Sequence, residues 1–156
     1  MDVAVSRLRK KLEPATNVQI VGKPELGYHL TQDDTRRVLV VEDDESLYNS
    51  YRLSLTSVAL VDFAATVAEC VSLLARQRYD AHFVDLSLGE DSGVDAIAAI
   101  RERSPRAPIM IVSGRADRDA LDLSAGLGVP YAIKPVSSEV LLRFVECARV
   151  DRIRVT

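Results

Sequence analysis

The sequence has little cysteine and no long apolar segment. Its two cysteines, Cys70 and Cys147, stand alone on apolar helical patterns without metal-ligand spacing around them. We therefore expect packing residues, and neither a disulfide framework nor a thiolate metal site. No apolar run approaches the roughly 18 residues that a membrane-spanning helix needs. Met1-Asp2-Val3 lacks the order of a signal peptide. These absences predict a soluble, cytoplasmic protein.

An excess of one charge sign is also absent from the whole chain. The 156 residues carry a net charge of −3, which does not indicate wholesale nucleic-acid binding. The 47% of hydrophobic residues is enough for a packed core. Residues 1–30, however, hold five basic and three acidic groups, so the remainder carries −5. This asymmetry indicates two segments with different partners.

Beyond a polar break at residues 31–35, strand and helix patterns alternate. The predicted strands are residues 38–41, 59–63, 81–84, 109–112 and 131–133. The first of them is fully apolar, as expected of a strand buried on both faces. The predicted helices are residues 45–55, a helix opening at Thr66, one after a glycine-containing loop, residues 117–127, and one starting near Ser137. Five strands alternating with five helices predict an α/β fold, a (βα)5 parallel sheet covered on both faces.

Two helices carry more detailed signals. Thr66 with Glu69 three residues later is typical of a capping box. Val67, Cys70, Val71 and Leu74 then form one helical stripe, and the last helix is expected to bury Leu141, Phe144, Val145 and Ala148.

The residues directly after the strands form one chemical set. In a parallel sheet the carboxyl ends of the strands share an edge, and ligands bind there where the strand order reverses. The set comprises Glu42, Asp43 and Asp44 after the first strand, Asp85 after the third, Ser113 after the fourth and Lys134 after the fifth.

Such a set is suited to a metal ion and phosphoryl transfer. Crowded carboxylates repel one another unless a cation lies among them, and Mg²⁺ accepts oxygen ligands. We expect Glu42, Asp43, Asp85 and the backbone carbonyl of Ser87 to hold it. When a metal ion screens its charge, the Asp85 carboxylate can attack a phosphoryl group, and Lys134 would stabilise the negative charge on the transferring phosphoryl oxygens. Ser113 would then bond a phosphoryl oxygen.

Each residue alone has an ordinary interpretation. An Asp after a strand is usually a turn residue, and acids at a helix start are favoured by the helix dipole. The prediction depends on complementary groups occurring together at four strand ends of one fold.

The blocks around these residues resemble the response-regulator receiver family. They are residues 38–44, 83–86, 111–114 and 131–135, and the match extends from residue 36 to about 150 in the family's order. The resemblance implies a flavodoxin-like receiver over residues 36–152. It implies that Asp85 takes phosphate from a histidine kinase or histidine phosphotransfer protein, in the presence of Mg²⁺. Ser113 and Tyr131 match the family's switch pair, and Gly93 its loop glycine.

The resemblance has departures. Gly89 stands where the family often has a proline, which would loosen the loop without touching a reacting group. Ser87 and Arg115 occupy positions that influence phosphoryl lifetime in similar receivers.

Residues 1–31 resemble a different element, the recognition helix and wing of winged-helix response regulators. The helical pattern ends at Leu12, and an expected strand pair follows at residues 18–21 and 27–30. The preceding helices of such a domain are missing, and thirty residues cannot bury a core. Either the chain is a piece of a longer regulator, or this remnant is adapted to another role, and we expect its DNA binding to be weak. The candidate DNA contacts are Arg7, Lys10 and Lys11.

The sequence argues against three other function classes. A receiver-like interaction module that never accepts phosphate would lack Asp85, the acidic pair or Lys134, and none is missing. A phosphohydrolase would need a second acid near Asp85, where Ser87 stands instead. A nucleotide-binding fold would need a glycine-rich loop after the first strand. We expect no enzyme beyond self-catalysed phosphoryl transfer, and a homodimer through the fourth receiver helix, fifth strand and last helix.

Overall fold

The computed structural model describes residues 3–12, 18–23, 27–32, 36–114 and 118–148. The chain divides into two compact units, Met1–Thr35 and Arg36–Thr156.

The first unit contains one helix and one strand pair. The helix α1 spans Val3–Leu12, and β1 (Val18–Lys23) pairs antiparallel with β2 (Gly27–Gln32). The helix and strand pair expected from the sequence are confirmed, each strand being two residues longer. Val5, Leu8 and Leu12 have the spacing of one apolar helical stripe in the sequence, but their side chains lie outside the described ones. The winged-helix interpretation of residues 1–31 remains a prediction.

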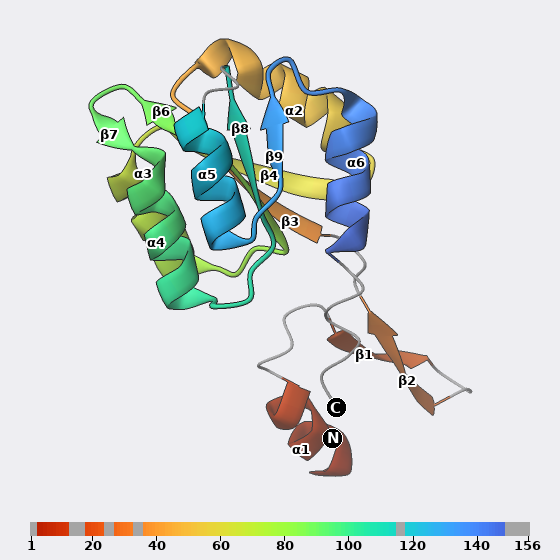
Figure 1. The fold of residues 1–156 in the computed structure, drawn as a ribbon. Helices are drawn as coiled ribbons and strands as arrows, with labels where there is room; N and C mark the ends of the chain where they lie inside the picture. Colours follow the sequence, from red (N-terminus) through yellow and green to blue (C-terminus); the bar gives the residue numbers. More distant parts are fainter. Residues whose placement is uncertain (1–2, 13–17, 24–26, 33–35, 115–117, 149–156) are drawn as a thin grey trace. The chain divides into compact units, whose positions relative to one another are not determined.

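The second unit is built on a five-stranded parallel sheet (Figure 1). Its strands are β3 (Arg36–Val41), β4 (Ala59–Ala64), β5 (Ala81–Asp85), β8 (Ile109–Ser113) and β9 (Tyr131–Ile133). The spatial order is β4-β3-β5-β8-β9. The chain therefore moves outward from β3 to β4, and then crosses to β5 and continues in the other direction. This reversal places the ends of β3 and β5 side by side, at the position where such sheets bind ligands.

Helices cover both faces of this sheet (Figure 1). On one face lie α2 (Tyr48–Leu55), preceded by the 3-10 turn η1 (Glu45–Leu47), and α6 (Ser138–Cys147). On the other lie α3 (Val67–Arg76), α4 (Gly93–Arg103) and α5 (Arg118–Leu127). The predicted (βα)5 fold is confirmed.

The central strands contribute side chains to the hydrophobic core on each face of the sheet, because successive side chains point to opposite faces. On β3, Leu39 and Val41 pack beneath α3 and α4, whereas Val38 and Val40 pack beneath α2 and α6. Both sets are fully buried. Burial on both faces explains why the strand reads as an uninterrupted apolar run.

The helix ends follow local sequence signals. Thr66 caps α3 by accepting a hydrogen bond from the Glu69 amide at 3.1 Å, and the Glu69 carboxylate accepts from the Ala65 amide at 2.8 Å. This is the expected capping box, except that the Glu69 carboxylate accepts from the amide of Ala65 and not from that of the N-cap residue Thr66. Gly128 follows α5 with a φ of +64°, a conformation that favours glycine at a helix end.

Two burial predictions are wrong and one holds only in part. Cys70 is buried, but Cys147 is exposed because the buried stripe of α6 contains Leu141 and Val145 instead. Val71 is 49% exposed, at the margin of the α3 stripe. Phe144 is only half-buried.

A short hairpin after β5 was not predicted. Ser87–Leu88 (β6) pairs antiparallel with Asp91–Ser92 (β7), turning through Gly89 at a φ of +61°. Each strand is too short to give an alternating sequence pattern. Among the described helices, none is long and apolar enough to cross a membrane.

Candidate functional site

Three carboxylates meet at the carboxyl ends of the two central strands. Glu42 follows β3 and Asp85 ends β5, and with Asp43 they offer ligand oxygens that lie within 4.8 Å of one another. Glu42 is 1% exposed and Asp85 is 6% exposed, whereas Asp43 is open to solvent. The strand order produces this meeting, because β3 and β5 are neighbours although about forty residues separate Glu42 from Asp85.

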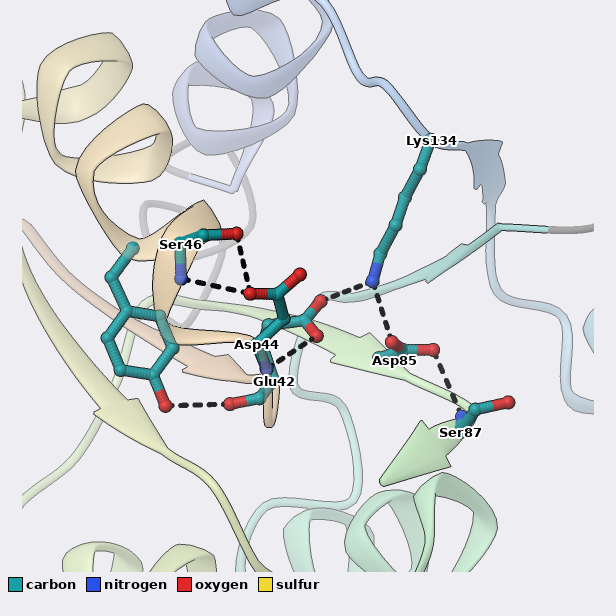
Figure 2. Close-up of polar contacts among 7 residues, drawn as sticks. Glu42, Asp44, Ser46, Asp85, Ser87 and Lys134 are labelled. Atoms are coloured by element: carbon teal, nitrogen blue, oxygen red, sulfur yellow. Dashed lines mark hydrogen bonds and ion pairs between the residues drawn. The ribbon is translucent and has the colours of Figure 1, made fainter. Parts of the chain in front are cut away.

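A lysine from the edge strand lies between two of these carboxylates. Figure 2 shows Lys134, which follows β9, reaching inward so that its Nζ lies 2.7 Å from Asp85 Oδ2. The same Nζ lies 2.5 Å from Glu42 Oε2 in an ion pair outside hydrogen-bond geometry. One ammonium thus contacts two buried carboxylates and offsets one of the two negative charges that they carry when ionised.

Main-chain groups hold the carboxylates in place (Figure 2). The Asp44 amide donates to Glu42 Oε1 at 3.1 Å, and the Ser87 amide donates to Asp85 Oδ1 at 3.0 Å. The Tyr48 hydroxyl donates to the carbonyl of Glu42 at 2.7 Å. Each buried carboxylate therefore has its orientation fixed before any ligand arrives.

Burial and charge change the acid–base properties of this cluster. Burial raises the pKa of Glu42, an effect that Lys134 and the Asp44 amide oppose and that the charge of Asp85 reinforces. For Lys134, burial acts to lower the pKa, but the bonds to Asp85 and Glu42 outweigh it and raise the pKa. The lysine is therefore held as an ammonium ion.

The loop after Asp85 is packed against the Asp85 main chain. A Cβ added at Gly93 would lie 2.1 Å from the carbonyl oxygen of Asp85, so only glycine fits there. The Gly93 amide donates to the Leu86 carbonyl at 3.0 Å. Asp91 accepts a hydrogen bond from the Val67 amide at 2.9 Å, which ties the loop to the start of α3.

The predicted switch residues lie on the neighbouring strands. Ser113 is 7% exposed at the end of β8, and its carbonyl accepts from the Lys134 amide at 2.8 Å. Tyr131 is half-buried on β9, opposite Ile111 of β8. The Ser87 side chain is exposed, and Arg115 lies outside the described residues. On α1, Arg7 and Lys10 are exposed, while the side chain of Lys11 is not described.

Two supporting residues had no clear sequence signal. Tyr48 was assigned only to a helix, and Asp91 to a loop. Each acts through a backbone partner, Glu42 and Val67 respectively. A contact between a side chain and a distant backbone group leaves no pattern in either segment.

The donor set fits a hard divalent cation. Carboxylate oxygens are the ligands that Mg²⁺ prefers, and one exposed carboxylate beside two buried ones leaves room for the waters it retains. Glu42, Asp43 and Asp85 would hold such an ion.

Comparison with known proteins agrees with this geometry. The family model described as "Response regulator receiver domain" matches residues 38–146. This chain belongs to the response regulator receiver family. Receivers of this family serve two-component signalling, bind Mg²⁺ at an acidic pocket and interact with histidine kinases or phosphotransfer proteins.

Individual response regulators are similar to this chain in sequence or in fold. The alginate biosynthesis transcriptional regulatory protein AlgB of Pseudomonas putida is 34% identical over 112 residues, which are 70% of this chain and 25% of AlgB. The chain thus spans about a quarter of that relative's length. A CheY-like receiver from Methanospirillum hungatei shares the fold, with a TM-score of 0.67 and 22% identity over 75% of this chain and 98% of the other.

A second solved structure has a ligand. It is a Burkholderia pseudomallei response regulator with a phosphorylated aspartic acid, calcium ion and citrate. It has 25% identity and a TM-score of 0.65, over 77% of this chain and 73% of the other.

Proposed function

We propose that Asp85 is the phosphoacceptor of a two-component pathway, phosphorylated with Mg²⁺ by a histidine kinase or histidine phosphotransfer protein. The observation that carries the proposal is the convergence of Glu42, Asp43 and Asp85, with the Lys134 ammonium in contact with two of them, Glu42 and Asp85. The phosphorylated aspartic acid of the Burkholderia relative supports the same chemistry.

The residues have distinct roles in this transfer. An Asp85 carboxylate oxygen attacks phosphorus, and the bond from phosphorus to the donor's imidazole nitrogen breaks, its electron pair returning to nitrogen. Lys134, already 2.7 Å from Asp85, stabilises charge on the phosphoryl oxygens. Bound Mg²⁺ would add a second positive charge there, held by Glu42, Asp43, Asp85 and the carbonyl of Ser87. No separate catalytic residue is needed.

The phosphoryl group would act as a switch. It adds about −1.5 to −2 charge units and three acceptor oxygens beside Asp85. Ser113 would move to bond one of them, and Tyr131 would turn inward toward the space it leaves. The surface of α5, β9 and α6 would then change, which makes it the candidate surface for homodimerisation or partner docking. Exposed Leu121, Ile133 and Val140 lie on these three elements.

The output remains a separate proposal. AlgB is a transcriptional regulator by name, and residues 1–31 resemble the end of a winged-helix domain, with Arg7, Lys10 and Lys11 as candidate DNA contacts. Thirty residues cannot bury a core of their own, so this segment by itself would bind DNA weakly. The alternative is a pseudo-receiver, an interaction module that docks partners without accepting phosphate.

Phosphorylation by a small donor separates the two. Incubation with Mg²⁺ and acetyl phosphate should add one acid-labile phosphoryl group to the wild type and none to Asp85→Asn. Asp44→Asn is the matched control, because the Asp44 side chain bonds Ser46 rather than the site. Equal phosphate uptake by wild type and Asp85→Asn would refute the assignment. No uptake by the folded wild type would favour the pseudo-receiver.

A Mg²⁺ titration tests the proposed metal site. Asp43→Ala should weaken Mg²⁺ binding and slow phosphorylation together. Unchanged Mg²⁺ affinity would remove Asp43 from the metal site.

A further inference from the structure

The amino-terminal edge of the receiver sheet carries a dense set of arginines. Three segments lie at the starts of three adjacent strands. Residues 36–37 begin β3, residues 76–80 precede β5 and residues 101–106 precede β8. Together they supply seven arginines and only two acids, Asp80 and Glu102. The arginine edge consists of Arg36, Arg37, Arg76, Arg78, Arg101, Arg103 and Arg106.

Hydrogen bonds hold these segments against one another. Arg37 Nη1 donates to Gln77 Oε1 at 2.8 Å, which joins the first segment to the second. Arg103 Nε donates to the Leu74 carbonyl at 3.3 Å, which joins the third segment to the end of α3. The arginines therefore lie on one continuous surface, at the opposite end of the strands from Asp85.

Several of these guanidinium groups are available for a ligand. Arg76, Arg78 and Arg106 are exposed. In the described part of the chain, none of the three has a carboxylate within ion-pair distance. Like charges held together this way cost free energy unless an anion offsets them, so their grouping indicates a polyanionic partner.

The side-chain type of these cations indicates which class of anionic partner they would bind. From residue 36 onward the chain has a single lysine, Lys134, which belongs to the phosphoacceptor site, so every cation of this edge is arginine. The planar guanidinium matches phosphate oxygens in pairs. No exposed large apolar side chain lies on these segments within the described residues, which leaves a lipid surface without an anchor.

The helix α1 is a second positive segment of the chain, because its ten residues hold four basic groups and no acid, and it exposes Arg7 and Lys10. Residues 1–35 as a whole carry five basic and five acidic groups, so their positive charge is concentrated in this helix. We propose that the arginine edge binds the phosphate backbone of nucleic acid, independently of sequence. The inference goes beyond phosphoacceptance and does not depend on it.

Salt-dependent DNA binding tests this proposal on the full chain. Affinity for a fluorescent duplex is measured by anisotropy between about 50 and 200 mM salt, where each phosphate contact contributes about 0.9 to the log–log slope. Replacing Arg76, Arg78 and Arg106 by alanine should weaken binding about tenfold or more at low salt and reduce the slope by about 2 to 3.

The matched control removes equal charge elsewhere on the receiver. Alanine at Arg52, Arg118 and Arg143, all exposed, should leave the slope unchanged. The same comparison in an Arg7→Ala, Lys10→Ala background isolates the edge from α1. Circular dichroism and acetyl phosphate uptake verify that both triple variants fold.

Four outcomes would overturn the proposal. They are no DNA binding by the wild type at low salt, equal slopes for the two triple variants, binding to phosphatidylcholine–phosphatidylglycerol vesicles in place of DNA, and displacement of the duplex by polyglutamate as efficiently as by unlabelled DNA. The last would indicate an acidic protein as the partner.

Discussion

The ammonium of Lys134 lies 2.7 Å from the carboxylate of Asp85, and the same nitrogen contacts Glu42 at 2.5 Å. Both carboxylates are almost completely buried, while the lysine side chain is 22% exposed. The lysine thus has a structural role before any phosphoryl group arrives, because it offsets the repulsion between two buried acids.

Lys134→Met should therefore lose stability as well as phosphorylation. Removing one partner of a buried ion pair costs about 3 kcal/mol, and we expect a loss of this size near pH 7. Burial raises the pKa of Glu42 above its ordinary 4.5, so the folded state takes up a proton more readily than the unfolded state. The stability linked to Glu42 is fully present below pH 4.5 and decreases as pH rises through the raised pKa.

The deficit of Lys134→Met should consequently shrink on acidification, as Glu42 becomes neutral. Urea unfolding of the metal-free protein across this pH range measures it, with Lys134→Arg as the charge-conserving control. A deficit that does not vary with pH would contradict the electrostatic explanation.

Gly93 allows a second, steric prediction. A methyl group at this position would meet the Asp85 backbone at 2.1 Å, and overpacking against a rigid neighbour costs about 1 to 3 kcal/mol. Gly93→Ala should lose at least this much and phosphorylate slowly. Gly126→Ala is the control, because open space surrounds Gly126 in α5 and a helical Gly→Ala change stabilises by up to about 1 kcal/mol. Chemical denaturation measures the free energy of unfolding of both variants. A Gly93→Ala protein as stable as wild type would refute the packing argument.

Asp91 is expected to position the loop after Asp85. Its bond to the Val67 amide fixes β7 against α3, and β7 pairs with β6, which contains Ser87. Asp91→Ala should cost about 1 kcal/mol and weaken Mg²⁺ binding, because the Ser87 carbonyl loses its support. Calorimetric Mg²⁺ titration distinguishes positioning from a purely structural role. Glu90→Ala, an exposed neighbour of equal charge, should leave both quantities unchanged, and equal effects of the two variants would argue against positioning.

His82 predicts a stability change in weak acid. The ring is 1% exposed, and burial lowers its pKa to about 4 from an ordinary 6.5. The folded state binds this proton less readily, so the stability contribution is present above pH 6.5 and is lost as pH falls toward 4. A shift of this size corresponds to about 3 kcal/mol.

Replacing His82 by leucine should flatten that dependence. Nδ1 faces the Pro108 carbonyl at 3.0 Å, which also accepts from the His82 amide at 3.0 Å and stays bonded in the variant. Urea midpoints at neutral pH and near pH 4.5 provide the comparison, with replacement of His29 as the control. If His82→Leu loses as much stability between neutral pH and pH 4.5 as the wild type does, the loss is due to the carboxylates and not to His82.

Ser113→Ala tests the proposed switch. Beryllofluoride, a phosphoryl mimic, should change self-association of the wild type through α5, β9 and α6, and the variant should respond weakly because it lacks the hydroxyl. Sedimentation velocity with and without the mimic measures the response, after phosphorylation of both proteins has been verified. The same shift in wild type and variant would rule out coupling from Ser113 to Tyr131 and leave Asp85 as the acceptor.

The sequence by itself determined the fold and the membership of the acidic cluster. Strands buried on both faces require uninterrupted apolar runs, as at residues 38–41 and 109–112. Parallel pairing then requires the residues that follow those runs to share an edge. Glu42, Asp85 and Lys134 could be grouped for this reason although they are far apart in the chain.

Only the tertiary structure decided how these residues are held and which neighbouring side chains matter. The bonds from Tyr48 to the Glu42 carbonyl and from the Val67 amide to Asp91 join a side chain to a backbone group, and backbone groups are the same at every position. The exposure of Cys147 depended on which side of α6 faces β3, β5 and β8. The arginine edge arose because its three segments lie at the starts of strands that become neighbours only when the sheet forms.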